Sequence, residues 1–177
     1  MQIEAVHEID LTPEQDAEIA ALIARAFGED AGYGNMSFYS QRHHLRLLAR
    51  LDGKLVGHYA LGFRAIRMGE HRVQIIGVGE VATDPDQRGK GVASALMVAA
   101  KERARTTLAD FIVLFGVRPL YEGVGFVAKP NIVRHMGIED DHSTEVIQEE
   151  DTALKVYQLK DTVWDDDAVI DLLGPSF

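Results

Sequence analysis

Apolar and polar positions follow a helical period near the start of this chain. Over residues 13–27 the apolar side chains recur every three or four positions, the spacing of a helix with one buried face. Thr12 and Gln15 fit a capping box around a proline at the first helical position, and Gly28 supplies a stop. The pattern therefore predicts a helix over residues 13–27, preceded by a short strand over residues 3–7.

Strand-like segments follow, and their turns predict an antiparallel meander. Residues 45–51 form an apolar strand, and the Asp52-Gly53 pair behind it is a strong hairpin signal. A long strand is expected over residues 54–67, a turn over residues 68–71 and a second long strand over residues 72–83. Adjacent strands joined by tight turns pair antiparallel, so we expect a meander here.

The remaining segments mix helices and strands, which places the fold in the α+β class. Residues 29–40, which contain glycines and an asparagine, predict an irregular loop or a short helix. The other expected elements are a helix over 91–108, a wholly apolar strand over 111–115, a short helix over 119–124, strand-like residues from Phe126 and a late strand over 153–159.

Length and composition fit one domain of 177 residues, with a core over residues 1–138 and a C-terminal extension over residues 139–177. No apolar run reaches the roughly 18 residues of a membrane span, and residues 1–4 lack the features of a signal peptide. There are no cysteines, which excludes disulfides, thiol nucleophiles and thiolate metal sites. We expect a cytoplasmic protein that does not bind membranes.

The net charge of −10 lies entirely in the C-terminal extension. Residues 1–138 hold 16 acidic and 16 basic side chains, whereas residues 139–177 hold 12 acidic and 2 basic ones. One interpretation is a surface that keeps the protein soluble, and the other is a negative field that attracts a cationic substrate. Nucleic acid is not an expected partner for this charge balance.

The segment after the meander carries the features of an anion site. Gly89 and Gly91 flank the expected start of a helix, where the first N–H groups have no partner inside the helix. Arg88 and Lys90 add positive charge, and residues 86–105 hold five basic and two acidic side chains. A polyphosphate ligand needs such a basic region, although an ordinary strand–turn–helix connection uses glycines as well.

Other motifs with related chemistry do not fit. A Walker loop requires glycine where Asp84 stands and serine or threonine where Gly91 stands. The dinucleotide pattern matches residues 77–82, but Thr83-Asp84-Pro85 follows where a helix should begin. Residues 123–128 match it as well, which shows that the pattern has little specificity, so we discard both matches. No G-x-S-x-G elbow surrounds a serine, and adjacent His43-His44 lacks metal-ligand spacing, so no metal is expected.

Two segments together resemble the GNAT superfamily of N-acetyltransferases. Arg88-Gly89-Lys90-Gly91-Val92-Ala93 is similar to the R-x-x-G-x-G/A signature of that family. Tyr121-Glu122-Gly123-Val124-Gly125-Phe126 is similar to its Y-E-x-x-G-F element. The resemblance covers roughly residues 3–130, with the helix and meander in the same order. It implies a GNAT-like fold, in which helices cover both faces of a mixed, largely antiparallel sheet.

The resemblance also implies a site for acetyl-CoA as co-substrate. The CoA pyrophosphate should lie on the backbone amides of residues 88–93, and pantetheine should pair with the strand end at residues 81–83. One N–H of that strand should polarise the thioester carbonyl. The expected cofactor-binding residues are Val81, Ala82, Thr83, Arg88, Gly89, Lys90, Gly91, Val92 and Ala93.

Acyl transfer to an amine requires removal of an ammonium proton and protonation of the departing thiolate. Tyr121 matches the family's tyrosine near the CoA sulfur and is our candidate general acid, with ring packing as its alternative role. Glu80, near the end of the motif strand, is the candidate base, with a solvent-facing strand position as the alternative. His58 is the second candidate base, although a lone strand histidine is more often structural.

The acceptor is less defined than the donor. The chain also resembles the aminoglycoside 2'-N-acetyltransferases, through the late strand and the aromatic and acidic residues Trp164-Asp165-Asp166-Asp167. It resembles the rhizobial nodulation N-acyltransferases through the meander. The charge distribution favours a cationic amine, above all a polyamine, an aminoglycoside or a Lys-rich peptide.

The sequence is also consistent with two other functions. One is an acyl-CoA-binding sensor without turnover, and the other is a nucleotide-binding module that uses the glycine loop. The oligomeric state stays open as well, with a homodimer among the alternatives.

Overall fold

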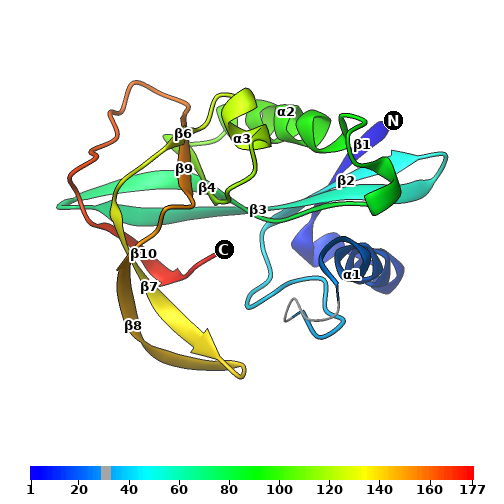
Figure 1. The fold of residues 1–177 in the computed structure, drawn as a ribbon, viewed down its shortest axis with the longest axis horizontal. Helices are drawn as coiled ribbons and strands as arrows, with labels where there is room; N and C mark the ends of the chain where they lie inside the picture. The colour runs from blue at the N-terminus through cyan, green and yellow to red at the C-terminus, as the bar shows by residue number, and fades with distance from the viewer. Residues whose placement is uncertain (29–32) are drawn as a thin grey trace. The chain divides into compact units, whose positions relative to one another are not determined.

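The computed structural model describes residues 1–28 and 33–177 and contains two compact units (Figure 1). The first unit comprises Met1–Gly62 and Gly79–Arg103, and the second comprises Phe63–Val78 and Ala104–Phe177. Two long strands, β3 (Lys54–Met68) and β4 (His71–Thr83), run through both units. Each unit therefore holds one part of the predicted meander.

The first unit combines a small antiparallel sheet with two helices. Besides its parts of β3 and β4, it contains β1 (Gln2–His7), η1 (Glu8–Asp10), α1 (Pro13–Phe27), β2 (Leu45–Leu51), η3 (Pro85–Gln87) and most of α2 (Val92–Arg105). β1 pairs antiparallel with β2, and β2 pairs antiparallel with β3.

The helices of this unit cover opposite faces of its strands (Figure 1). On one face, Leu48 and Leu55 form a buried cluster with Val6 and with the apolar side of α1. On the other face, a Cβ added at Gly57 would lie 2.5 Å from a methyl carbon of Val92, so only glycine lets α2 pack this closely. The expectation of helices on both faces is thus met within this unit.

Local sequence signals account for the ends of α1 and for the first hairpin. Gln15 donates its backbone N–H to the Thr12 hydroxyl at 3.2 Å, and the Thr12 N–H donates to the Gln15 side chain at 3.1 Å. Gly28 ends the helix with φ of 89°, a value that favours glycine. Asp52 and Gly53, with φ of 48° and 81°, make the tight turn between β2 and β3.

The second unit is built mainly of strands. Its further elements are β5 (Phe111–Phe115), α3 (Leu120–Gly123), β6 (Val127–Ala128), β7 (Ile132–Glu139), β8 (His142–Glu150), β9 (Leu154–Gln158) and β10 (Ile170–Pro175). The path of paired strands runs β6-β9-β5-β4-β3-β10-β7-β8. β5 pairs parallel with β4, and β10 pairs parallel with β7. The pairs β10–β3, β5–β9, β6–β9 and β7–β8 are antiparallel.

The α+β class and the mixed, largely antiparallel sheet are confirmed. The first four residues of the loop or short helix expected over 29–40 lie outside the described residues. The strand-like character expected from Phe126 onward corresponds to β6, β7 and β8, whereas β10 is a strand that the sequence pattern did not predict. Among the described residues, no helix has both the length and the apolar character needed to cross a membrane.

Candidate functional site

The predicted phosphate loop joins β4 to α2 through two glycines in a left-handed conformation. Gly89 has φ of 75° and Gly91 has φ of 82°, values that L side chains rarely adopt. A Cβ built at either glycine would meet nothing within 4 Å, so the space beside this backbone is open. α2 begins directly afterwards at Val92, with its N-terminal N–H groups at the same end.

The charges around this loop suit an anion. The first turn of α2 contains no acidic residue, which leaves the positive end of the helix dipole uncompensated. Arg88 donates a hydrogen bond to the Ala26 carbonyl at 2.6 Å, and Lys90 donates to the Gln87 side chain at 3.3 Å. Both contacts lie at the exposed surface, so the two cations border the open backbone.

A buried carboxylate fixes the approach to the loop. Asp84 has a side chain that is 3% exposed, and it bonds Lys54 at 3.0 Å and Arg25 at 3.4 Å. It also accepts the Asp86 backbone N–H at 3.1 Å. The hydrogen bond from Lys54 keeps the pKa of Asp84 below its usual value. Asp84 thus stays ionised and ties the loop to β3 and α1.

The end of β4 departs from regular strand geometry at Glu80. The residue has φ of 49°, an uncommon backbone conformation for a residue other than glycine, asparagine or aspartate. Pairing of β4 with β5 covers Ile75–Val78 in the described chain, while β4 continues to Thr83. Residues 81–83, where pantetheine is expected, therefore follow an irregular residue within the strand.

His58 holds this irregular turn of β4 in place. Its Nδ1 lies 2.9 Å from the Glu80 carbonyl oxygen, and its Nε2 lies 3.3 Å from Arg46 Nη1. Nδ1 must then donate to the carbonyl while Nε2 accepts from the guanidinium, which defines a neutral imidazole. Burial and the nearby Arg46 lower the pKa of His58 to about 3. Both ring nitrogens are engaged, which favours the structural role for His58 over the role of base.

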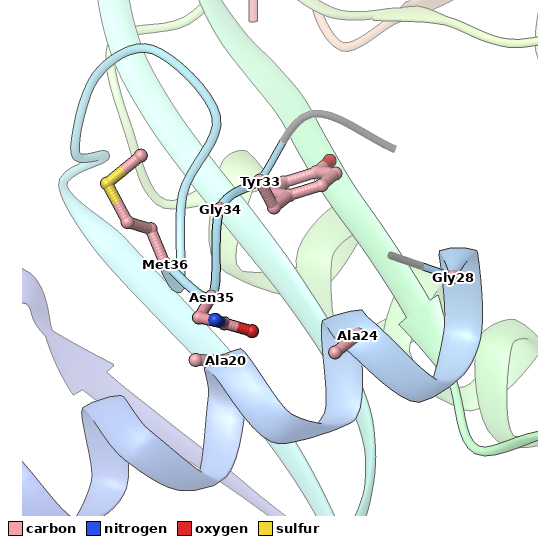
Figure 2. A pocket seen from close by; sticks show the side chains of 7 residues that line it. All are labelled: Ala20, Ala24, Gly28, Tyr33, Gly34, Asn35 and Met36. Atoms are coloured by element: carbon pink, nitrogen blue, oxygen red, sulfur yellow. The ribbon is translucent and has the colours of Figure 1, made fainter. Parts of the chain in front are cut away.

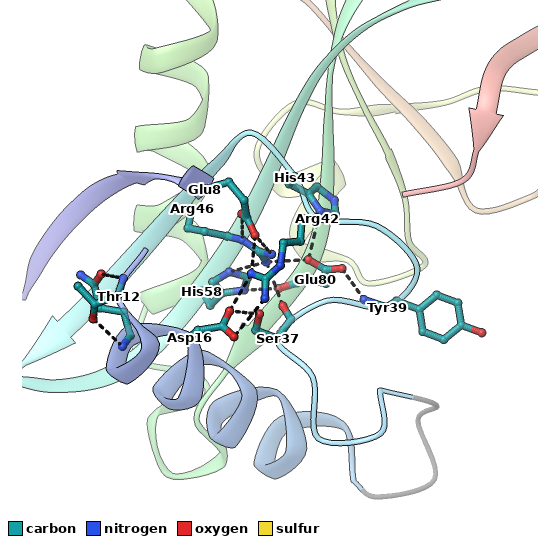
Figure 3. A network of polar contacts seen from close by, with 11 residues as sticks. Glu8, Thr12, Asp16, Ser37, Tyr39, Arg42, His43, Arg46, His58 and Glu80 are labelled. Atoms are coloured by element: carbon teal, nitrogen blue, oxygen red, sulfur yellow. Dashed lines mark hydrogen bonds and ion pairs between the residues drawn. The ribbon is translucent and has the colours of Figure 1, made fainter. Parts of the chain in front are cut away.

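Arg46, fully buried on β2, is the centre of an ionic cluster (Figure 3). Its Nε and Nη2 donate to the two carboxylate oxygens of Glu8 at 2.6 and 3.0 Å. Its Nη1 donates to Glu80 Oε2 at 2.9 Å and to the Ser37 carbonyl at 3.0 Å. A buried guanidinium needs hydrogen-bond acceptors, and each of its three nitrogens has at least one here.

A second arginine extends the cluster toward the surface. Arg42 donates to Asp16 at 2.9 and 3.2 Å and to Glu8 at 3.0 Å (Figure 3). The Ser37 hydroxyl also donates to Asp16, at 2.5 Å. With neutral histidines, the cluster holds three carboxylates and two guanidinium groups. It therefore carries one negative charge more than positive, which favours the arrival of a cation.

Glu80 lies inside this cluster and does not face solvent. Its side chain is 4% exposed, and it accepts the Tyr39 backbone N–H at 3.0 Å as well as Arg46. Burial raises the pKa of Glu80 above its ordinary value, while Arg46 opposes the shift. The alternative of a solvent-facing strand residue does not describe this position. A carboxylate with a raised pKa is a stronger base than an exposed carboxylate with the ordinary pKa.

His43 is buried against Glu80 and is unusual in its hydrogen bonding. Its Nδ1 lies 3.5 Å from Glu80 Oε2, and neither ring nitrogen has a hydrogen-bond partner among the described residues. Burial and the charge of Arg46 lower the pKa of His43 to about 4, so the ring is neutral at neutral pH. Buried ring nitrogens without a hydrogen-bond partner are rare in folded proteins, so His43 is a candidate functional residue.

Tyr121, the candidate acid, belongs to the second unit. It lies on α3 and is 5% exposed, and its ring is 6.3 Å from that of Phe126. A Cβ at Gly116 would lie 2.5 Å from the Tyr121 ring, so glycine is needed for the ring to pack there. Burial raises the pKa of Tyr121, which keeps its phenolic proton in place at neutral pH.

The sequence reasoning missed Arg46, Arg42, Glu8, Asp16 and the role of His43. One signal existed for Arg46, because it is the one charged residue between leucines at positions 45 and 47 and shares a strand face with Leu48. Glu8 and Asp16 give no such signal, since both resemble ordinary acidic surface residues in the sequence.

Comparisons with known proteins show the family and the fold of this chain. A family model described as an acetyltransferase (GNAT) domain matches residues 9–128. None of the curated proteins compared matches the chain. No group of three or more potential metal ligands occurs among residues 1–28 and 33–177.

Several solved structures share the fold. A GNAT family N-acetyltransferase from Escherichia coli, YhbS, in complex with CoA has a TM-score of 0.67 at 20% identity, over 96% of this chain and 88% of the other. A GNAT family acetyltransferase from Brucella melitensis in complex with acetyl-CoA has a TM-score of 0.59 at 21% identity, over 94% of each chain. An acyl-CoA N-acyltransferase from Pseudomonas aeruginosa has a TM-score of 0.57 at 20% identity, over 88% of this chain and 96% of the other.

Proposed function

Because the chain belongs to the GNAT acetyltransferase family, we propose that it transfers an acetyl group from acetyl-CoA to a primary amine that is cationic in water. One observation carries the proposal: the open backbone at Gly89 and Gly91, at the start of α2, beside Arg88 and Lys90. Glycines without side-chain obstruction, a helix N-terminus and two cations together suit a pyrophosphate. The CoA-bound relatives support the same ligand.

Two parts of acetyl-CoA would bind two neighbouring segments, the loop before α2 and the end of β4. The pyrophosphate would accept hydrogen bonds from the amides of residues 88–93, and pantetheine would pair with the backbone of residues 81–83. The left-handed backbone at Glu80 supports this placement, because an irregular residue in a strand interrupts regular pairing beside it. One of these N–H groups would stabilise the oxyanion of the tetrahedral intermediate.

The chemistry requires the acceptor to lose a proton before attack. We assign Glu80 as the base, acting through a water molecule because its carboxylate is nearly inaccessible. The free amine then attacks the thioester carbonyl carbon, and the attacking nitrogen gives its second excess proton to water as the C–S bond breaks and the amide forms. By its resemblance to the family's tyrosine, Tyr121 would give its proton to the departing CoA thiolate and regain one from solvent. The excess negative charge around Arg46 supports binding of an ammonium before this step.

The acidic C-terminal region would add long-range attraction for the acceptor. Glu145, Glu149 and Glu150 on β8 are exposed, and Asp166 is half-exposed where it pairs with Lys129 at 2.7 Å. Exposed carboxylates of one sign raise the rate at which a cation arrives. A cationic amine is therefore the favoured acceptor class over a neutral or acidic amine.

A panel of amines incubated with acetyl-CoA tests the function by release of free thiol. We expect release that depends on a cationic primary amine, with N-acetylated amine formed in equal amount. Binding of CoA without amine-dependent release would instead indicate a sensor. Thermal stabilisation by ATP and NAD but not by CoA would indicate a nucleotide-binding module.

A further inference from the structure

His43 is a buried imidazole that the proposed reaction does not yet use. Its side chain is 8% exposed, and neither ring nitrogen has a hydrogen-bond partner among the described residues. Nδ1 lies 3.5 Å from Oε2 of Glu80, the proposed base (Figure 3). Cδ2, on the opposite edge of the ring, lies over Gly62 of β3, where an added Cβ would be 3.8 Å away. The ring therefore lies between β3 and the carboxylate, with Nδ1 on the side of Glu80.

The other contacts of Glu80 cannot carry a proton to it. Oε1 accepts the Tyr39 backbone N–H at 3.0 Å, and Oε2 accepts from Arg46 at 2.9 Å. A backbone amide and a guanidinium stay protonated at neutral pH and only donate hydrogen bonds. Among the contacts that the described residues make with this carboxylate, the one to His43 is the one able to take up and release a proton.

The segment that donates to Glu80 begins with a tight turn against α1, over residues 33–36 (Figure 2). Gly34 and Asn35, its two central residues, have positive φ of 53° and 65°, a combination typical of a turn with a fixed shape. A few residues later, the Tyr39 N–H reaches Glu80. A turn of defined shape thus supports the contact that orients the carboxylate beside His43.

The carboxylate determines which ring nitrogen of His43 carries the hydrogen. An ionised carboxylate only accepts hydrogen bonds, so the nitrogen that faces Glu80 is the protonated one. Nδ1–H then points to Oε2, and the lone pair is on Nε2. The contact of 3.5 Å is long for a hydrogen bond, as catalytic hydrogen bonds often are before a substrate binds. Nε2 is left as an acceptor that is closed to bulk solvent.

The charges around His43 disfavour its action as an independent base. Burial and then the charge of Arg46 on β2 lower the pKa of His43 to about 4, and the adjacent His44 acts in the same direction. Glu8 of η1 and the Gln41 backbone oppose this shift without cancelling it. An imidazolium is thus unfavourable here. A relay avoids the charged ring, because one proton leaves Nδ1 as another arrives at Nε2.

We propose that His43 relays a proton from the acceptor ammonium to Glu80. The inference rests on the proposed acetyl transfer and specifies the route by which Glu80 acts through water. An ammonium N–H bond breaks as the water takes this proton and gives one of its own to Nε2. The Nδ1–H bond then breaks as the Oε2–H bond forms. After the amide has formed, Glu80 returns its proton to Nδ1 and Nε2 gives its proton to water, which restores the first tautomer.

Kinetics with two amines of similar shape and different basicity test the relay. The probes are ethylamine, which is an ammonium at neutral pH, and 2,2,2-trifluoroethylamine, which is mostly the free amine there. His43→Gln keeps a polar amide beside Glu80 but cannot exchange one tautomer for another. The matched control is His44→Gln, because His44 is the adjacent histidine and is exposed.

We expect His43→Gln to lower kcat/KM for ethylamine about 10²-fold, the low end for general acid–base catalysis. The loss for 2,2,2-trifluoroethylamine should be less than about 3-fold, because this amine has no ammonium proton to remove before attack. His44→Gln should match the wild type with both amines. Equal losses for the two amines in His43→Gln would overturn the relay, since a structural role lowers both alike, and so would wild-type kcat/KM with ethylamine.

Nitrogen NMR of the histidine rings needs no turnover and covers the case in which His43→Gln fails to fold. We expect the wild-type His43 ring to be neutral at neutral pH with its hydrogen on Nδ1. A hydrogen on Nε2 would overturn the relay while leaving acetyl transfer intact. A hydrogen on Nδ1 without thiol release from the wild type with any amine would refute acetyl transfer, and the relay with it, while confirming the pairing of His43 with Glu80.

Discussion

Replacing Arg46 by methionine should destabilise the protein because it removes the cation from a buried cluster of carboxylates. Methionine keeps most of the aliphatic volume, so the main loss is electrostatic. Glu8 would keep Arg42, at 3.0 Å, and Glu80 would keep the Tyr39 N–H, at 3.0 Å, and the neutral His43 ring, whose Nδ1 lies 3.5 Å away. Both carboxylates would remain largely shielded from water, at 8% and 4% exposure.

The expected loss is about 3–5 kcal/mol in the free energy of unfolding, the usual cost of breaking a buried ion pair from one side. Arg42→Met is the matched control, because Arg42 is 45% exposed and contacts Glu8 and Asp16. Exposed pairs contribute less than about 1 kcal/mol, so this variant should stay close to the wild type.

Urea unfolding followed by circular dichroism, at about pH 8 and about pH 5.5, measures these differences. Burial raises the folded-state pKa of Glu80 above its unfolded value, so its contribution to stability is present at low pH and is lost as pH rises through the folded pKa. Removing Arg46 should raise that pKa further, so the penalty should be larger at the higher pH.

Adding Glu80→Gln to Arg46→Met should recover roughly 1–3 kcal/mol relative to the sum of the single effects. Additive losses, or an Arg46→Met variant as stable as Arg42→Met, would refute the electrostatic role of the cluster.

The remaining predictions concern chemistry, steering and pH. Tyr121→Phe should keep CoA affinity and lower kcat about 10²-fold where chemistry limits the rate; unchanged turnover would refute its role as acid. Neutralising Asp165, Asp166 and Asp167 to asparagine should flatten the fall of kcat/KM for the acceptor with rising salt, while the KM for acetyl-CoA stays constant; equal rates for acidic and cationic amines at low salt would contradict steering. His43 and His58 have folded pKa values of about 4 and about 3, below the unfolded value of 6.5. Because the unfolded chain takes up these protons first, each histidine should lower the free energy of unfolding as pH falls below 6.5, by up to about 1.4 kcal/mol per pH unit. His58→Gln should make that dependence shallower in pH-dependent urea unfolding, and an unchanged slope would mean that His58 is charged in the fold.

The parts of the fold that local chemistry specifies were predictable from the sequence. The capping box at Thr12, the stop at Gly28 and the turn at Asp52-Gly53 each act within a few residues, and the structure has all of them. The glycine loop before α2 belongs to the same class, because its backbone conformation is set by Gly89 and Gly91 themselves.

The features that could not be predicted depend on contacts between residues far apart in the sequence. Arg46 meets Glu8 and Glu80 across separations of 38 and 34 positions, so no local pattern marks the three as one cluster. The left-handed backbone at Glu80 runs against the preference of glutamate and is supported by His58 on a neighbouring strand. β10 pairs with β3 and β7, which are remote in the chain, and its own residues lack a clear alternation.

Calorimetric titration with CoA tests most directly whether the loop before α2 holds the donor. The variants are Gly91→Glu and, as a matched control, Gly53→Glu. Both glycines have positive φ, 82° and 81°, and a Cβ at either would meet nothing within 4 Å, so backbone strain and added charge are alike. We predict that Gly53→Glu binds CoA as the wild type does, while Gly91→Glu shows no measurable binding because its carboxylate repels and blocks the pyrophosphate. Wild-type affinity in Gly91→Glu would contradict the assignment of this loop as the CoA site.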